Sequence, residues 1–139
     1  MPTRTEFKQL AKLRLKEAET LYSARLYDGC VYLCGYVVEF ALKARICKLL
    51  GLTDYPASGK FKNVYAVHDI NHLLILSGLQ PKLDLGNVDL YTNWSLATPW
   101  TPERRYMPKG STDRASAREI LDAVRSTPNG VLKWIMRYW

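Results

Sequence analysis

The segment 100–110, WTPERRYMPKG, holds the densest group of side chains able to bind an anion. Arg104 and Arg105 carry planar sets of donors that fit phosphate or carboxylate oxygens. Trp100 and Tyr106 flank them, and aromatic rings beside cations can stack nucleobases, as in proteins that bind single strands. The segment follows neither the helical nor the strand period, so we expect a loop. Its residue types favour contact with a phosphate-bearing ligand.

Glu39 is a second candidate for chemistry, because it is a carboxylate inside the apolar stretch 28–50. A buried carboxylate without a partner is costly, so we expect a hydrogen-bonded or cationic neighbour. Lys43, one helical turn later, is the nearest candidate. Arg104 or Arg105 is another, in which case the aromatic residues of segment 100–110 would fill one end of the fold. A structural ion pair and a functional acid with a shifted pKa both remain open.

The third candidate is the sequence HDINH, in which His68 and His72 are four residues apart. Two histidines at this spacing share a helix face and can bind a metal ion, but no third ligand is evident nearby. The alternative is a polar cluster at a helix start, with Asp69 in a structural role. We favour that alternative and predict neither a metal site nor a cofactor.

Composition restricts the class of protein. A chain of 139 residues with 47% hydrophobic residues suits one compact domain, residues 1–139. The net charge of +7 favours a polyanionic partner, although it also serves solubility. No signal peptide and no apolar run of about 20 residues is visible, so we expect a cytoplasmic protein. The sequence contains neither a nucleophile-elbow motif nor a glycine-rich phosphate loop.

The elements that must position these side chains are all predicted to be helical. Apolar residues recur at helical spacing, and no alternating strand pattern occurs. We therefore predict an all-α fold, an up-and-down antiparallel bundle of four to five helices. Proline and glycine break the pattern at Pro81, at Gly86 and within 128–130. The helical segments are expected at 5–25, 28–50, 69–79, 87–96, 112–125 and from 131 onward, with a loop over 51–67.

Several residues are predicted to shape the first two helices. Thr3 or Thr5 can cap the first helix, Asp28 can cap the second, and Gly51 can end it. Gly35 lies inside the second helix, where glycine costs up to ~1 kcal/mol relative to alanine. We therefore expect another part of the chain to pack closely against Gly35.

Three segments, taken in order, resemble the HEPN domain family, a group of small, mainly prokaryotic helical proteins. They are GYVVEFALKARI (35–46), HDINHLL (68–74) and WTPERRYMPKG (100–110), and the resemblance extends over residues 5–138. The chain looks like a stand-alone member. The matching positions are Gly35, Tyr36, Glu39, Leu42, Lys43, Ala44, His68, Asp69, Ile70, Arg105, Tyr106 and Pro108.

The resemblance implies a helical bundle that commonly forms homodimers. Many family members are metal-independent ribonucleases with an R-x4-6-H motif, some are toxin–antitoxin partners of a minimal nucleotidyltransferase, and others bind nucleotides or RNA without cleavage. In this chain no arginine precedes a histidine at the ribonuclease spacing, and a ribonuclease of that kind needs both residues.

We therefore predict a homodimeric, non-catalytic module that binds a nucleotide, RNA or a protein partner such as a nucleotidyltransferase. Its ligand would contact a basic lip, formed by Arg104, Arg105, Tyr106 and Lys109. The lip would lie near His68, with Lys43 below it and Glu39 holding it in place. The alternative is a divergent metal-independent ribonuclease that uses Arg105 with His68 or His72.

Overall fold

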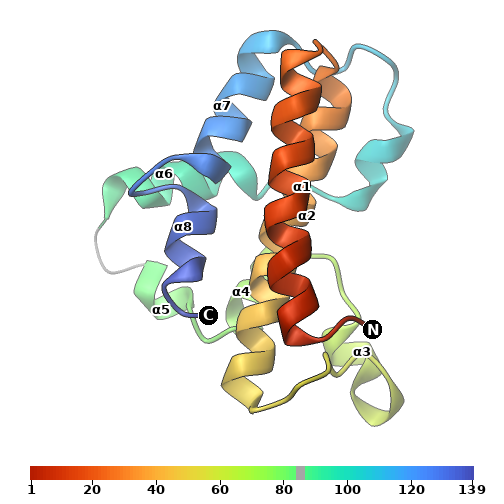
Figure 1. The fold of residues 1–139 in the computed structure, drawn as a ribbon, viewed down its shortest axis with the longest axis vertical. Coiled ribbons are helices and arrows are strands. Elements are labelled where there is room, and N and C mark those ends of the chain that lie inside the picture. Colours follow the sequence, from red (N-terminus) through yellow and green to blue (C-terminus); the bar gives the residue numbers. More distant parts are fainter. Residues whose placement is uncertain (84–86) are drawn as a thin grey trace.

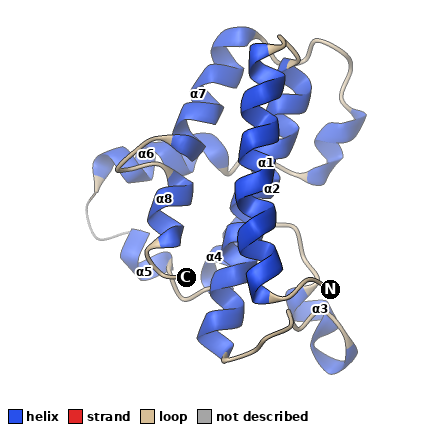
Figure 2. Cartoon of the chain, in the orientation of Figure 1, coloured by secondary structure: helices blue, strands red, loops and turns tan. Residues whose placement is uncertain are grey.

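The computed structural model describes residues 1–83 and 87–139, and Gly86 lies outside them. Within these residues there are eight α-helices and two 3-10 helices but no β-strand, so the predicted all-α class is confirmed (Figure 2). One isolated bridge joins Thr3 to Asp54. The helices are α1 (Arg4–Ser23), α2 (Tyr27–Leu50), η1 (Gly59–Phe61), α3 (Lys62–Tyr65), α4 (Ile70–Leu76), α5 (Gln80–Leu83), α6 (Val88–Ala97), η2 (Pro102–Tyr106), α7 (Arg114–Arg125) and α8 (Val131–Met136).

The antiparallel pair α1 and α2 forms the spine of the molecule (Figure 1). Helix α2 is apolar on most sides because it is surrounded: α1 covers one side, and α7, α8 and α4 pack on others. Helices α6 and α7 also pack on each other, which extends the core away from the spine. The cysteines predicted to be core residues, Cys30, Cys34 and Cys47, are all buried free thiols. In the described part of the chain, no helix is long and apolar enough to cross a membrane.

The ends of the two long helices follow the prediction at two points and depart from it at one. Thr3 caps α1 and forms a capping box with Glu6. Gly51 ends α2 in the left-handed conformation, with φ of 66°. Asp28, however, does not cap α2: the helix begins at Tyr27, and Leu26 at the cap position makes no side-chain hydrogen bond. The Asp28 carboxylate instead accepts hydrogen bonds from a distant segment, described below.

Two segments that were predicted to be loops contain short helices. A third segment, between α7 and α8, interrupts the last helical region. The predicted loop over 51–67 contains η1 and α3, which are too short to show an apolar period. Segment 100–110, also predicted to be a loop, forms the 3-10 helix η2, with Pro102 in its first turn. For residues 128–130 the sequence left open a break or a kink, and the structure shows a break, because α7 ends at Arg125 and α8 begins at Val131.

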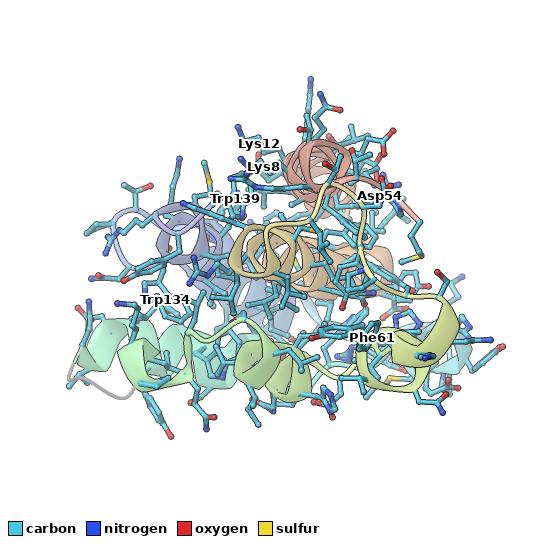
Figure 3. The ribbon with its side chains drawn as sticks, turned by 90° about the horizontal axis from the view of Figure 1, so that it is seen from below. Lys8, Lys12, Asp54, Phe61, Trp134 and Trp139 are labelled. Atoms are coloured by element: carbon cyan, nitrogen blue, oxygen red, sulfur yellow. The ribbon has the colours of Figure 1, made fainter. Side chains whose placement is uncertain are left out.

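Aromatic side chains near the C-terminus complete the core between the helices. Trp134 is buried in edge-to-face contact with Trp94. The Trp139 indole donates a hydrogen bond from Nε1 to the Ala41 carbonyl of α2. Figure 3 shows Trp139 below α1, where Lys8 and Lys12 each lie 5.7 Å from its ring centroid. The end of the chain is thereby fastened to both helices of the spine.

Candidate functional site

Glu39, Lys43 and His68 form a cluster of charged and polar side chains, here called the Glu39 cluster. Glu39 is only 1% exposed, and its Oε1 accepts a 2.7 Å hydrogen bond from Lys43 Nζ. His68 Nδ1 lies 3.0 Å from Oε1 and 3.1 Å from Oε2. The carboxylate therefore has the partners that burial requires, and the predicted pairing of Glu39 with Lys43 is observed.

The start of α4 holds His68 over Glu39. The Asp69 carboxylate accepts a 2.8 Å hydrogen bond from the His72 amide and so caps α4, which leaves His68 just before the helix. The side chain of His68 is 56% exposed. Because Nδ1 faces Glu39, the other ring nitrogen, Nε2, remains available to a ligand.

Lys43 does not belong to the exposed surface, which corrects its assignment to the anion-binding residues. Its side chain is 4% exposed, since Nζ is held between Glu39 and the face of the Tyr55 ring, 5.3 Å from the ring centroid. Tyr55 is itself buried and donates a hydrogen bond to the Tyr65 carbonyl. Burial raises the pKa of its hydroxyl, so Tyr55 stays neutral beside the ammonium group.

Two tyrosines of α2 connect the Glu39 cluster with the basic lip. The hydroxyl oxygens of Tyr32 and Tyr36 are 3.4 Å apart. The pKa of Tyr36 is raised to about 12, first by burial, then by the contact with Tyr32 and by the negative charge of Glu39, while the charge of Arg105 opposes the shift. Tyr36 precedes Glu39 by one turn of α2, and its ring centroid lies 4.9 Å from that of Trp100, so it connects the cluster with segment 100–110.

The basic lip presents its charges to solvent. The Arg105 guanidinium lies 4.7 Å from the centroid of the Tyr106 ring, which is 72% exposed. Arg105 Nη1 donates to the Pro102 carbonyl at 3.2 Å, and Nη2 is 3.9 Å from the Glu103 carboxylate. At this distance and exposure, the pair with Glu103 is weak. Lys109 is also exposed.

Neither arginine of the lip contacts Glu39, so the alternative in which one of them neutralises this carboxylate is wrong. Both carboxylate oxygens of Glu39 are taken by Lys43 and His68. Arg104 instead lies near Asp28 and places a guanidinium nitrogen 3.8 Å from the Met107 sulfur. The sequence could not decide between His68 and the two arginines as the further partner of Glu39, because all three lie far from it along the chain.

Trp100 fastens the lip to α2. Its indole lies directly on Gly35, where an added Cβ would come within 1.9 Å of the ring. The indole Nε1 donates a 3.0 Å hydrogen bond to the Tyr32 carbonyl, and the side chain is 4% exposed. The expected close packing on Gly35 is thus observed. Trp100 cannot stack on a nucleobase in this position, so Tyr106 is the exposed ring of the pair.

Asp28 fastens the other end of the lip. Its carboxylate accepts hydrogen bonds from the backbone amides of Gly110, at 2.7 Å, and Thr112, at 2.9 Å. These two amides, followed by the positive charge of Arg104, lower the pKa of the Asp28 carboxyl. The sequence showed only an aspartate near the start of a helix, and such a residue is equally consistent with a helix cap. Trp100 and Asp28 hold the lip from both sides.

His72, the second histidine of HDINH, does not join the Glu39 cluster. It is exposed on the first turn of α4, and only its backbone amide is hydrogen-bonded among the described residues. Across residues 1–83 and 87–139, no three His, Cys, Asp or Glu side chains come together as a metal site would require. His68 is therefore the histidine that the fold brings to Glu39.

Comparison with known proteins tests the family resemblance that was inferred from the sequence. The model of the HEPN domain family matches residues 5–127 of the 139 residues, and the chain belongs to this family. The resemblance inferred from the three motifs is thus confirmed. Comparisons with curated proteins and with solved structures find no significant match. A role related to nucleotides or RNA follows from the family.

Proposed function

We propose that this HEPN domain binds single-stranded RNA or a nucleotide at the basic lip. The observation that carries the proposal is the Arg105–Tyr106 pair, a guanidinium stacked on an exposed ring. Among the described residues, it has only one weak carboxylate neighbour. The exposed guanidinium can bind a phosphate, and the ring can stack on a base. Lys109 adds charge that attracts a polyanion.

The fixed position of the lip supports binding. A flexible loop loses conformational freedom when it binds a ligand, whereas a segment that is already ordered loses less. Here Trp100 on Gly35 and Asp28 on the Gly110 and Thr112 amides order the segment without using the lip's own cations. Arg105 and Tyr106 are thereby left free for a ligand.

The test is fluorescence anisotropy with labelled single-stranded RNA, in EDTA and at two salt concentrations. We expect binding that weakens as salt rises, and Arg105→Ala should reduce the salt slope by about 0.7, the contribution of one contact to a single strand. Tyr106→Ala should weaken binding by ~1–3 kcal/mol through lost stacking. Lys133→Gln, which removes an exposed charge from α8, is the matched control. RNA binding that is equal in Arg105→Ala and Lys133→Gln would refute the proposal.

A second candidate function is cleavage of RNA without a metal, and the geometry of His68 favours it. A buried carboxylate on Nδ1 fixes the imidazole, and the side chain is 56% exposed, so that Nε2 is turned away from Glu39, an arrangement that suits a general acid or base. Arg105 belongs to η2, which packs on α2, the helix that carries Glu39, and in this hypothesis it holds the scissile phosphate. In this hypothesis His68 transfers the proton.

Cleavage is tested in the same EDTA reaction by resolving the RNA on a gel. If the protein is a ribonuclease, His68→Ala abolishes the product while RNA binding persists. His72→Ala is the matched control, because it removes an exposed histidine that does not touch Glu39, and it should leave cleavage intact. If the unmodified protein leaves RNA intact, the cleavage hypothesis is refuted, and RNA binding remains the proposed function.

We also propose that the protein forms a homodimer. The supporting feature is an exposed apolar groove between α1 and α2, lined by Leu13, Leu21 and Leu33 together with the stems of polar residues. Leu13 is 46% exposed, and an apolar patch of this kind favours contact with another protein. Sedimentation should show a dimer that Leu13→Asp dissociates. A monomer that instead binds a nucleotidyltransferase through this groove would indicate the partner-protein role.

A further inference from the structure

A cationic pocket, separate from the basic lip, lies at the end of the bundle where α1 turns into α2 and α7 begins (Figure 1). It has a volume of about 350 Å3, within the range of small-ligand sites. The lining residues are Tyr22, Ser23, Arg25, Tyr27 and Arg114. Two guanidinium groups, two phenols and a hydroxyl offer donors to an anion but no carboxylate to repel one.

Arg25 occupies a backbone position that normally selects glycine. Its φ is 64°, the left-handed region. The Arg25 amide donates to the Tyr22 carbonyl at 3.0 Å, and the Leu26 amide donates to the Leu21 carbonyl at 2.8 Å. This is the Schellman motif, in which glycine is usual at the left-handed residue because a Cβ is unfavourable there. The chain thus places an arginine where the backbone alone favours glycine.

The guanidinium groups of this pocket lack acidic partners. Arg118, on the next turn of α7, is paired with Asp122 at 2.8 Å. By contrast, neither Arg25 nor Arg114 has a carboxylate within ion-pair distance among the described residues, and Arg114 Nε only donates to the Tyr22 hydroxyl at 3.4 Å. The pKa of Tyr22 is lowered by its contacts with Arg114 and Arg118, a sign of the positive potential at this end.

The pocket and the basic lip are joined by one ordered stretch of chain. Thr112 is hydrogen-bonded to Asp28, so Arg114 follows the lip after a short fixed connection. Tyr27 of the pocket precedes Asp28, and it lies about 7.5 Å along the α2 axis from Tyr32, at the ~1.5 Å rise per residue of a helix. The lip lies beside Tyr32, since Trp100 is bonded to its carbonyl.

We propose that the pocket of Arg25 and Arg114 is a second phosphate site, which binds a backbone phosphate of the same RNA strand that contacts the lip. The inference rests on the proposed function. Two separate cation sites joined by a short ordered connection favour a strand over a mononucleotide, because a strand carries successive phosphates and a mononucleotide does not. The left-handed Arg25 fits this role, since an unfavourable backbone conformation is kept where the side chain is needed.

The decisive variant is Arg25→Gly, which has opposite expected effects on folding and on binding. Glycine suits the left-handed position, so the melting temperature should rise by about 3 °C. Affinity for single-stranded RNA should fall roughly fivefold, and the salt slope should decrease by about 0.7. Arg114→Gln should weaken RNA binding similarly without the gain in melting temperature. Lys133→Gln is the control for the loss of one positive charge.

Pyrophosphate probes the pocket in the Arg105→Ala protein, whose lip has lost its exposed arginine. It should raise the melting temperature of Arg105→Ala, but not that of the double variant Arg25→Gly with Arg105→Ala. If RNA fails to bind the unmodified protein, the proposed function fails, and stabilisation of Arg105→Ala by pyrophosphate that requires Arg25 would still support the pocket. If RNA binds and depends on Arg105 while Arg25→Gly keeps full affinity and salt slope, the second site is refuted. Equal stabilisation of Arg105→Ala and of the double variant by pyrophosphate would refute it too.

Discussion

The Glu39 cluster and the basic lip lie along the same helix but use charge in different ways. In the cluster, Glu39 and Lys43 are nearly inaccessible to solvent and are 2.7 Å apart. In the lip, the Arg105 guanidinium faces solvent and its nearest carboxylate oxygen is 3.9 Å away. Charge that is buried and paired is needed for the fold, whereas charge that is exposed and weakly paired is available for a ligand. Substitutions on the two sides should therefore separate stability from binding.

The largest effect on stability is expected from Glu39→Ala. It leaves the Lys43 ammonium buried without a counter-charge, and breaking a buried pair in this way costs about 3–5 kcal/mol. Urea unfolding followed by circular dichroism measures the loss. The double variant Glu39→Leu with Lys43→Leu removes both charges and should be less destabilised than Glu39→Ala. If the single variant is the more stable of the two, the unpaired Lys43 ammonium is not the cause of the loss.

Gly35→Ala should have the next largest effect, because the added Cβ would overlap the Trp100 indole. Overpacking of this kind costs about 1–3 kcal/mol, and the displaced indole should also weaken RNA binding at the lip. Gly29→Ala is the control in the same helix, since its Cβ would meet only the flexible end of Leu21, at 3.2 Å. Thermal unfolding compares the two, and equal melting temperatures would argue against tight packing of Trp100.

Asp28 should give the anchoring of the lip a dependence on pH. Its carboxyl has a lowered pKa in the folded protein, so its contribution to stability is present above the ordinary carboxyl pKa of about 3.9 and is lost as pH falls through the lowered value. Asp28→Asn should lack this contribution. Unfolding measured from pH 6 to pH 2 should show the two proteins differing above about pH 4 and converging below it. A constant difference would contradict the assignment.

The smallest effect on stability is expected from Arg105→Ala, which should change unfolding by no more than about 0.5 kcal/mol. Its side chain is exposed and makes one hydrogen bond to the Pro102 carbonyl. The same variant should weaken RNA binding. It should therefore affect binding more than stability, whereas Glu39→Ala should mainly reduce stability. Differential scanning calorimetry gives the value. A loss of several kcal/mol would show that Arg105 serves the fold as the buried cluster does.

Local patterns in the sequence predicted the parts of this fold that depend on neighbours within a helix. The apolar period located the long helices, Gly51 marked the end of α2, and the four-residue spacing indicated the pair of Glu39 and Lys43. A helix brings residues three and four apart together, so these relations can be derived from spacing alone.

The contacts that build the site could not be derived in this way, because they join distant segments. Asp28 meets Gly110 across 82 positions, and Trp100 meets Tyr32 across 68. Each residue type had a reasonable local role, such as helix cap for Asp28, and only the packing of η2 on α2 selected the distant partner. His68 reaches Glu39 through the packing of α4 on α2, which is also a long-range contact. The left-handed Arg25 had no signal, since arginine is unusual at that position.

The burial of Trp100 has a consequence for optical measurements. Its indole is in edge contact with Tyr36, at 4.9 Å between ring centroids, and lies on Gly35 beside the lip. The other tryptophans have different surroundings: Trp94 and Trp134 pack on each other, and Trp139 lies under Lys8 and Lys12 (Figure 3). Replacing these three with phenylalanine would leave Trp100, beside the lip, as the single tryptophan of the chain. Its emission would then report local movement of the lip when a ligand binds, without an added dye.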